Sequence, residues 1–92
     1  MKNIALFGST GSIGTQTVDI IEKYPDKFRL VSCFANKNTE GILRQADRFN
    51  PEFIGLYDES AQRSLMEKYT GKAEIISPRK HEKEIVSNSD IV

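Results

Sequence analysis

Apolar residues are arranged along this chain in two patterns that alternate. Residues 4–7 are consecutive apolar residues, which is typical of a strand buried on both faces of a parallel sheet. Residues 13–24 then carry apolar side chains at helical spacing, and this pattern stops at Pro25. The alternation continues to the end of the chain. It predicts strands over residues 3–8, 28–35, 53–57, 73–76 and 90–92, helices over residues 13–24, 39–49 and 58–69, and a last helix anchored by Ile85 and Val86.

Residues at the predicted boundaries have the chemistry of helix ends. Asp58 is placed to cap the N-terminus of the third helix, and Gly71 to end that helix in a left-handed conformation. Ser77 and Pro78 suit the N-cap and the first position of the last helix, and Ser12 suits the cap of the first. Each proline lies at an element boundary, which supports the segmentation.

Alternating strands and helices predict an α/β fold. We expect a Rossmann-like doubly wound parallel sheet that is incomplete, with about four strands and the start of a fifth. In the common strand order, the first strand is central, with the second and third on one side and the fourth on the other. The ligand-binding crevice is then expected between the first and fourth strands.

Three of the six glycines follow the first strand, at Gly8, Gly11 and Gly14. They lie where a strand joins a helix, and a helix N-terminus offers unpaired N–H groups and a partial positive charge to an anion. Gly8 is predicted to allow the tight turn and Gly11 the close approach of a pyrophosphate. Gly14 is predicted to let the helix pack closely on the sheet.

Hydroxyl groups in the same loop, on Ser9, Thr10 and Ser12, are candidate donors to phosphate oxygens. The spacing G-x-x-G-x-x-G differs from the commoner G-x-G-x-x-G, but the strand–loop–helix context is that of a dinucleotide site. A mononucleotide P-loop is excluded, because it needs a lysine directly after the last glycine and Thr15 stands there.

The end of the second predicted strand favours NADP over NAD. NAD-binding domains place an acid there for the ribose 2′-hydroxyl, and residues 30–39 contain none. Lys37 instead supplies a positive charge for a 2′-phosphate, and Asn36 and Asn38 supply amide donors. The alternative is a polar loop in which Asn38 merely lies near a helix start.

Composition and charge narrow the class of partner. Thirteen basic and thirteen acidic residues cancel, so no net charge favours nucleic acid or an acidic membrane. No apolar run reaches the ~20 residues of a membrane span, and from the strand-like sequence that begins at residue 3 we expect no signal or transit peptide. The single cysteine excludes an internal disulfide and fits a reducing compartment. We expect a cytoplasmic protein.

Three further groups have structural explanations that we favour over chemical ones. Asp58 and Glu59 suit a helix start better than a metal pair. His81 lies in a mixed-charge segment, where an exposed position is expected, and Cys33 lies within a predicted buried strand.

The segment LFGSTGSIGTQTVDII, residues 6–21, closely resembles the opening of the 1-deoxy-D-xylulose 5-phosphate reductoisomerase family. FRLVSCFANKN and FNPEFIGLYDE resemble the next two segments of that family, and the resemblance covers all 92 residues. It implies that the chain is the N-terminal part of an NADPH-binding domain, without the catalytic and C-terminal domains. The cofactor-binding residues implied by matching motifs are Thr10, Gly11, Ser12, Ile13, Asn36, Lys37 and Asn38. Asn36 departs from the glycine that many relatives carry.

The resemblance also implies a reaction for the parent enzyme. It would rearrange deoxyxylulose phosphate with Mg²⁺ or Mn²⁺ and reduce it with NADPH, giving 2-C-methyl-D-erythritol 4-phosphate for isoprenoid synthesis. Its substrate is a sugar phosphate, and a homodimer is implied. The metal and substrate ligands lie in a later domain, so we assign no catalytic or metal residue here and expect these 92 residues to be inactive alone.

Two alternatives from other classes stay open on the residues. One is a fragment of another NADP-dependent short-chain dehydrogenase or epimerase, although no tyrosine is followed four positions later by the lysine that such enzymes use. The other is a stand-alone nucleotide-binding module. Cooperative unfolding of the chain as a stable monomer would support this alternative.

Overall fold

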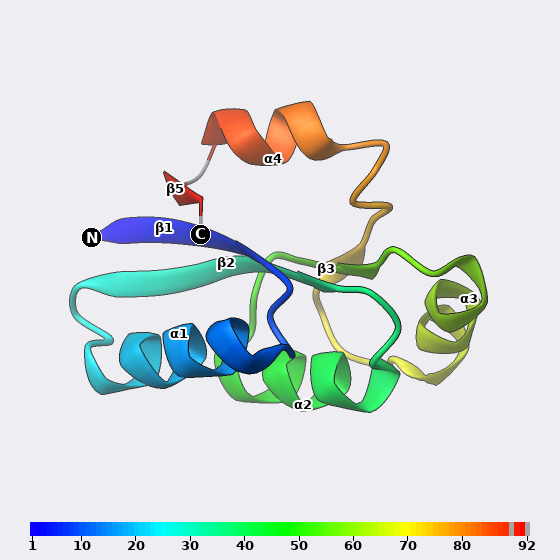
Figure 1. Ribbon diagram of the computed structural model, residues 1–92, viewed down its shortest axis with the longest axis horizontal. Helices are drawn as coiled ribbons and strands as arrows, with labels where there is room; N and C mark the ends of the chain where they lie inside the picture. The colour runs from blue at the N-terminus through cyan, green and yellow to red at the C-terminus, as the bar shows by residue number, and fades with distance from the viewer. Residues whose placement is uncertain (89, 92) are drawn as a thin grey trace.

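Parallel strands and helices alternate along the described part of the chain (Figure 1). The computed structural model describes the backbone of residues 1–88 and 90–91 and the side chains of residues 1–85. The elements in chain order are β1 (Lys2–Phe7), α1 (Ser12–Lys23), β2 (Phe28–Ala35), α2 (Thr39–Phe49), β3 (Phe53–Leu56), α3 (Glu59–Lys68), β4 (Glu74–Ile75), α4 (Glu82–Asn88) and β5 (Asp90–Ile91). The predicted α/β class is confirmed. The predicted strand residue Val92 and the predicted anchoring side chain of Val86 lie outside the described residues.

The order of the strands differs from the predicted one. It is β4-β3-β2-β1-β5, with parallel neighbours throughout, so β4 extends the sheet beyond β3 and β5 lies beside β1. The prediction that the fourth strand lies across from β1 is therefore wrong. After β3, a right-handed crossover can place the next strand either beyond β3 or beside β1. Local hydrophobic patterns do not distinguish between these two positions. The strand order reverses between β1 and β5, and a doubly wound sheet is expected to bind its ligand at such a reversal.

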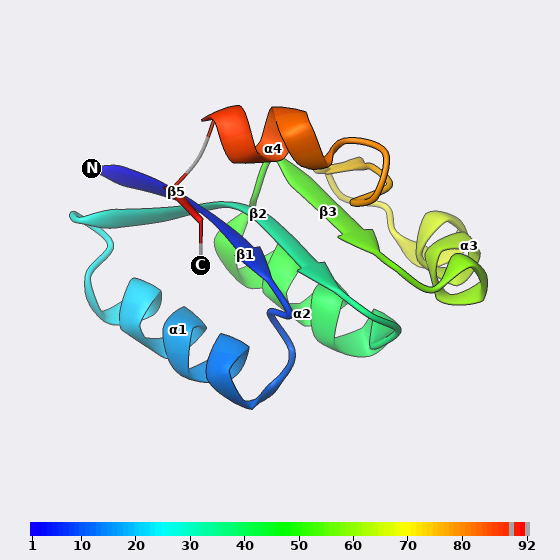
Figure 2. The same ribbon diagram turned by 45° about the horizontal axis from the view of Figure 1, so that its top comes forward.

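Helices cover both faces of the sheet, but unequally. Figures 1 and 2 show α1 and α2 on one face and α4 on the other, where it returns the chain to β1. The larger core joins β1, β2 and β3 to the buried faces of the first three helices, through Val18 and Ile21 of α1, Ile42 and Ala46 of α2 and Leu65 of α3. On the α4 face, the buried residues Ala5, Phe34 and Ile85 form a smaller core. The change of face coincides with the reversal of strand order.

The end of α3 does not use the predicted glycine cap. Gly71 is not in the left-handed region, and α3 ends at Tyr69 in an extended conformation (φ −79°, ψ 129°). The Tyr69 hydroxyl accepts a hydrogen bond from the Ala73 N–H at 2.9 Å, so this side chain closes the turn instead. The left-handed cap belongs to α2, at Asn50 (φ 48°).

The last helix begins later than predicted. Ser77 and Pro78 precede a turn, in which the His81 N–H donates to the Ser77 carbonyl at 3.2 Å, and α4 begins at Glu82. The prediction that Ser77 caps α4 is wrong. Pro78 is buried, and its ring lies 3.2 Å from the position a Cβ would take at Gly55 of β3, so packing against the sheet holds this segment.

Candidate functional site

The glycines of the β1–α1 loop have the roles predicted for Gly8 and Gly14. Gly8 has φ 72°, in the left-handed region, which allows the turn out of β1. A Cβ on Gly14 would lie 2.1 Å from the Gly8 carbonyl oxygen, so only glycine fits where α1 meets the loop. At Gly11, by contrast, a Cβ would meet only the Gly8 carbonyl, at 3.4 Å. The fold itself does not require glycine there, and its absent side chain leaves the outer surface of the loop open.

The N-terminus of α1 has no cap from a side chain. Gly11 occupies the N-cap position with extended backbone (φ −79°, ψ 179°), and no acidic residue stands in the first turn. The prediction that Ser12 caps this helix is wrong, because Ser12 is already its first residue. Within the described part of the chain, the N–H groups of Thr10, Ser12 and Ile13 have no hydrogen-bond partner. Unpaired donors at the positive end of a helix dipole are the features of a candidate anion site.

The other long helices that begin at this edge are capped. The Asn38 side chain accepts from the Gly41 N–H at 3.0 Å at the start of α2, and Asp58 accepts from the Ala61 N–H at 2.9 Å at the start of α3. The predicted cap at Asp58 is therefore confirmed. The oxygen of the Asn38 amide is engaged in its cap, so the NH₂ group of that amide is the part left for a ligand.

The fold brings the two predicted segments, residues 10–13 and 36–38, to the same edge of the sheet. The Ser9 N–H donates to the Phe34 carbonyl near the end of β2 at 3.0 Å. A Cβ on Gly41 of α2 would lie 2.7 Å from the Thr10 methyl carbon, so the loop and the start of α2 are in direct contact. Lys37 is exposed beside them, and it forms no ion pair among the described residues.

The three loop hydroxyls are not equivalent. Ser9 is fully buried, so its hydroxyl does not reach the surface of the loop and its predicted role as a phosphate donor is wrong. Its burial follows from its position under the loop, between β2 and α2. Thr10 is half-buried and Ser12 exposed, and both remain available to a ligand.

One polar contact at this site was not predicted from the sequence. The Gln45 Nε2 donates to the Ser9 carbonyl at 2.8 Å, across 36 residues of sequence. Gln45 is one helical turn after Gly41, on the side of α2 that contacts the loop. Gln45 belongs to no sequence motif, and its spacing of one helical turn from Gly41 is the only signal from which its contact with the loop could have been predicted.

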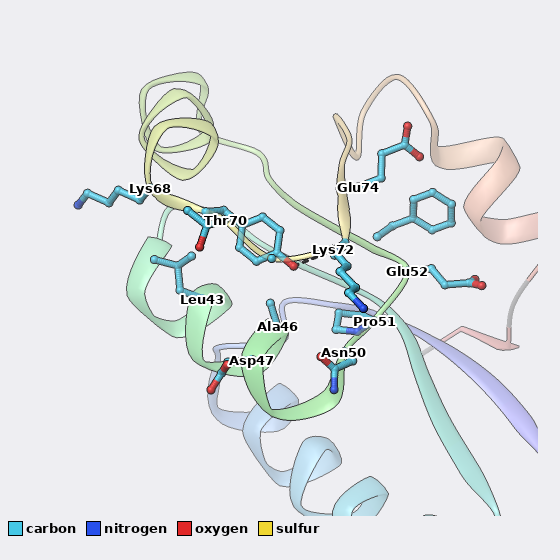
Figure 3. Close-up of a pocket in the computed structure, with 14 residues that line it drawn as sticks. Leu43, Ala46, Asp47, Asn50, Pro51, Glu52, Lys68, Thr70, Lys72 and Glu74 are labelled. Carbon is cyan, nitrogen blue, oxygen red and sulfur yellow. Dashed lines mark hydrogen bonds between the residues drawn. The ribbon is translucent and has the colours of Figure 1, made fainter.

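A broad groove of about 950 Å³ lies elsewhere, at the amino ends of β3 and β4 (Figure 3). Its walls come from the C-terminal parts of α2 and α3, and its charged lining residues are Asp47, Glu52, Lys68, Lys72 and Glu74. None of the predicted cofactor-binding residues lines it. It therefore offers neither the free backbone donors nor the helix N-terminus of the glycine loop.

Cys33 and His81, which the sequence offers as candidates for chemistry, lie in surroundings that give them a structural role. Burial raises the pKa of Cys33 to about 12, so its thiol is neutral at physiological pH and behaves as a core side chain. The expectation that His81 is exposed is wrong: the residue is half-buried, with Nδ1 3.1 Å from the Ser77 carbonyl oxygen. At the end of β3, burial raises the pKa of Tyr57, the negative charge of Glu82 raises it further, and the Arg79 guanidinium lowers it.

No group of three or more potential metal ligands occurs within residues 1–85, and no helix of the described residues is long and apolar enough to cross a membrane.

Comparison with known proteins places these features in one family. A sequence profile of 1-deoxy-D-xylulose 5-phosphate reductoisomerase matches residues 4–92. The reductoisomerase of Crocosphaera subtropica is 49% identical over 65 residues, covering 71% of this chain and 16% of the relative. That of a Thermoanaerobacter species is 38% identical over 93 aligned positions, covering 100% of this chain and 24% of the relative. The chain thus spans about a quarter or less of the length of these curated relatives.

Solved structures agree with the sequence comparison. The reductoisomerase from Zymomonas mobilis in complex with NADPH matches with a TM-score of 0.80 and 28% identity, over 91% of this chain and 22% of that one. A DOX-P reductoisomerase in complex with NADPH, fosmidomycin and magnesium matches with a TM-score of 0.86 and 26% identity, over 99% of this chain and 23% of that one. These matches support the reductoisomerase family over the alternatives of a short-chain dehydrogenase or epimerase fragment and of a stand-alone nucleotide-binding module. The chain belongs to the 1-deoxy-D-xylulose 5-phosphate reductoisomerase family.

Proposed function

We propose that these 92 residues form the NADPH-binding portion of a 1-deoxy-D-xylulose 5-phosphate reductoisomerase. One observation carries the proposal: α1 begins without a side-chain cap or an acid, directly after a loop whose N–H groups are unpartnered among the described residues. An uncapped helix N-terminus of this kind is complementary to a pyrophosphate. The solved relatives that contain NADPH support the choice of dinucleotide.

The residues support binding of the pyrophosphate and of the adenosine end of the cofactor. The N–H groups of Thr10, Ser12 and Ile13 would donate to the pyrophosphate, and the bare backbone of Gly11 lets it come close. Asn36, Lys37 and the NH₂ group of Asn38 would line the adenosine end, with Lys37 as counter-charge to the 2′-phosphate. NADPH supplies the hydride when it is bound, and the role of this chain is to bind and orient it.

The whole reaction belongs to the parent enzyme. We propose that the parent rearranges and reduces deoxyxylulose phosphate with Mg²⁺ or Mn²⁺, as a cytoplasmic homodimer, and that its metal and substrate ligands lie in other parts of the family fold. The magnesium and fosmidomycin in a solved relative support the metal and a phosphorylated substrate. The 92 residues by themselves are expected to bind the cofactor without turnover, because hydride transfer needs a substrate held against the nicotinamide.

Titration of the chain with 2′-phospho-ADP-ribose and with ADP-ribose tests the cofactor assignment. The two ligands differ only in the 2′-phosphate, so their affinity ratio isolates its recognition. We expect the phosphorylated ligand to bind at least about tenfold more tightly, as for a charge-assisted contact. Equal affinities would contradict the choice of NADP, and no binding of either would contradict the site.

A charge reversal at Lys37 sharpens this test. Lys37→Glu is expected to remove most of the preference for the 2′-phosphate, because a carboxylate would face it. Lys72→Glu is the matched control, since Lys72 is also exposed but lines the groove at the amino ends of the strands. An unchanged preference in Lys37→Glu would show that other residues recognise the 2′-phosphate.

A further inference from the structure

We propose that Gln45 is a positioning residue of the cofactor site, which holds the Ser9–Thr10 peptide so that the Thr10 N–H faces the pyrophosphate. This inference rests on the proposed function of the β1–α1 loop. It assigns to α2 a role in phosphate binding that the glycine motif does not contain.

The Ser9 peptide groups are held from two neighbouring elements. The Ser9 N–H donates to the Phe34 carbonyl of β2 at 3.0 Å, and the Ser9 carbonyl accepts from Gln45 Nε2 of α2 at 2.8 Å. Ser9 itself is fully buried. The residue before the exposed part of the loop is therefore fixed on the side away from solvent.

Holding the Ser9 carbonyl also sets the direction of the next N–H. The carbonyl of Ser9 and the N–H of Thr10 belong to one planar trans peptide, in which they point in opposite directions. Because Gln45 draws the carbonyl toward α2, the Thr10 N–H points away from α2. This N–H has no partner among the described residues, and it is one of the donors assigned to the pyrophosphate.

A second contact from the same helix supports the loop. Gly41 precedes Gln45 by one turn of α2 and lies directly against the Thr10 methyl group. The N-cap of α2 is Asn38, which belongs to the proposed adenosine end. The helix thus fixes the spacing between the phosphate loop and residues 36–38.

The environment of Gln45 is not the one that stability alone would favour. Its Oε1 is buried without a hydrogen-bond partner among the described residues, which costs free energy. Gln62 of α3 makes a similar tether but uses both ends of its amide: Nε2 donates to the Ile76 carbonyl at 2.9 Å, and Oε1 accepts from the Leu56 N–H at 2.7 Å. An apolar side chain of similar size at position 45 would remove the unpaired oxygen and, with it, the hold on the loop.

The test compares two ligands that share the 2′-phosphate but differ in the pyrophosphate, 2′-phospho-ADP-ribose and adenosine 2′-phosphate. In Gln45→Met we expect affinity for the first to fall about tenfold, as for the loss of a positioned hydrogen-bond donor, and affinity for the second to change less than about twofold. Thermal stability should change little, because the substitution removes the unpaired Oε1 but also leaves the Ser9 carbonyl without its donor. Gln62→Met is the control, and it should lower the melting temperature without changing the ratio of the two affinities.

The outcomes separate this inference from the proposed function. If the unmodified chain fails to bind 2′-phospho-ADP-ribose, the proposed function itself is wrong. If the chain binds it and Gln45→Met keeps full affinity, or loses both ligands equally, the positioning role of Gln45 is overturned. Gln45→Leu provides a second apolar variant, and failure of both variants to fold would likewise contradict the inference, because a purely structural Gln45 would then be indicated.

Discussion

The N-termini of α1 and α3 lie at the same edge of the sheet and differ in two respects, the side-chain cap and the charge of the first turn. Both helices follow a parallel strand, and both have an N-cap residue with extended backbone. At α3, Asp58 caps the helix and Glu59 stands in the first turn. At α1, the N-cap is Gly11 and the first turn contains no acid.

This difference shows how one backbone arrangement serves two purposes. In α3 the Asp58 side chain pairs with the Ala61 N–H, and the acids Asp58 and Glu59 lie at the positive end of the dipole, which stabilises the fold by about 1 kcal/mol. In α1 the chain forgoes this stabilisation, so the same groups stay available to an external anion. Side chains at two or three positions therefore decide whether a helix start is a structural element or a binding site.

The largest effect is expected for Gly14→Ala, which tests whether α1 must begin this close to the loop. The added Cβ would lie 2.1 Å from the Gly8 carbonyl oxygen, so the helix or the loop must move. We expect a loss of about 3 kcal/mol or more in the free energy of unfolding, measured by urea denaturation. Gly11→Ala is the control, because its Cβ makes only an ordinary contact at 3.4 Å, and its loss should stay within about 1 kcal/mol. Equal losses in the two variants would refute the assigned packing role of Gly14.

Gly11→Asp converts the start of α1 into a copy of the start of α3. The extended backbone at Gly11 suits an aspartate cap, so stability should rise by roughly a few tenths of a kcal/mol, since glycine is itself an acceptable N-cap. The new carboxylate would occupy the N–H groups and repel a pyrophosphate. NADPH affinity, measured by fluorescence titration, should therefore fall by about 100-fold, as expected when a charged contact becomes repulsive. Retained affinity in a variant that folds would show that the pyrophosphate binds elsewhere.

Asp58→Ala makes the complementary change at α3. Loss of the hydrogen bond from the Ala61 N–H should destabilise the fold by about 1 kcal/mol. NADPH affinity should change less than about twofold, since this helix start is not assigned to the cofactor. Denaturation and titration of the same sample check both expectations. A large loss of affinity would show that α3 also takes part in binding.

The smallest effect is expected for Glu22→Gln, at the opposite end of α1. Glu22 pairs with Arg48 of α2, and both side chains are about half-exposed. Such surface pairs contribute about 0–1 kcal/mol, so we expect a loss of at most about 0.5 kcal/mol and unchanged NADPH affinity. A change in affinity here would mean that binding depends on the packing of the whole helix, rather than on its N-terminus alone.

Much of the fold follows from short-range patterns in the sequence. Continuous apolar runs predicted β1, β2 and β3, and helical spacing predicted α1, α2 and α3, with the N-cap correct only at Asp58 of α3. The turn at Gly8 and the close packing at Gly14 were predicted because local backbone geometry requires glycine there. The residues proposed to bind the cofactor were predicted from the same loop and from a family resemblance, and their contacts with NADPH remain a prediction.

Long-range contacts account for what was missed. The positions of β4 and β5 in the sheet depend on which face each crossover helix covers. Each of these strands has only two residues, too few for their hydrophobic pattern to indicate the neighbouring strand. The contact of Gln45 with Ser9 joins residues 36 positions apart and depends on how α2 is rotated against the loop.

The sequence by itself determined where the strands and helices form and where the backbone needs glycine, because those features depend on neighbours within about one or two turns of chain. Only the tertiary structure decided the strand order, the burial of Ser9 and the half-paired amide of Gln45. Each of these depends on packing between elements that are distant in the chain, and the free energy of that packing is not encoded in any single segment.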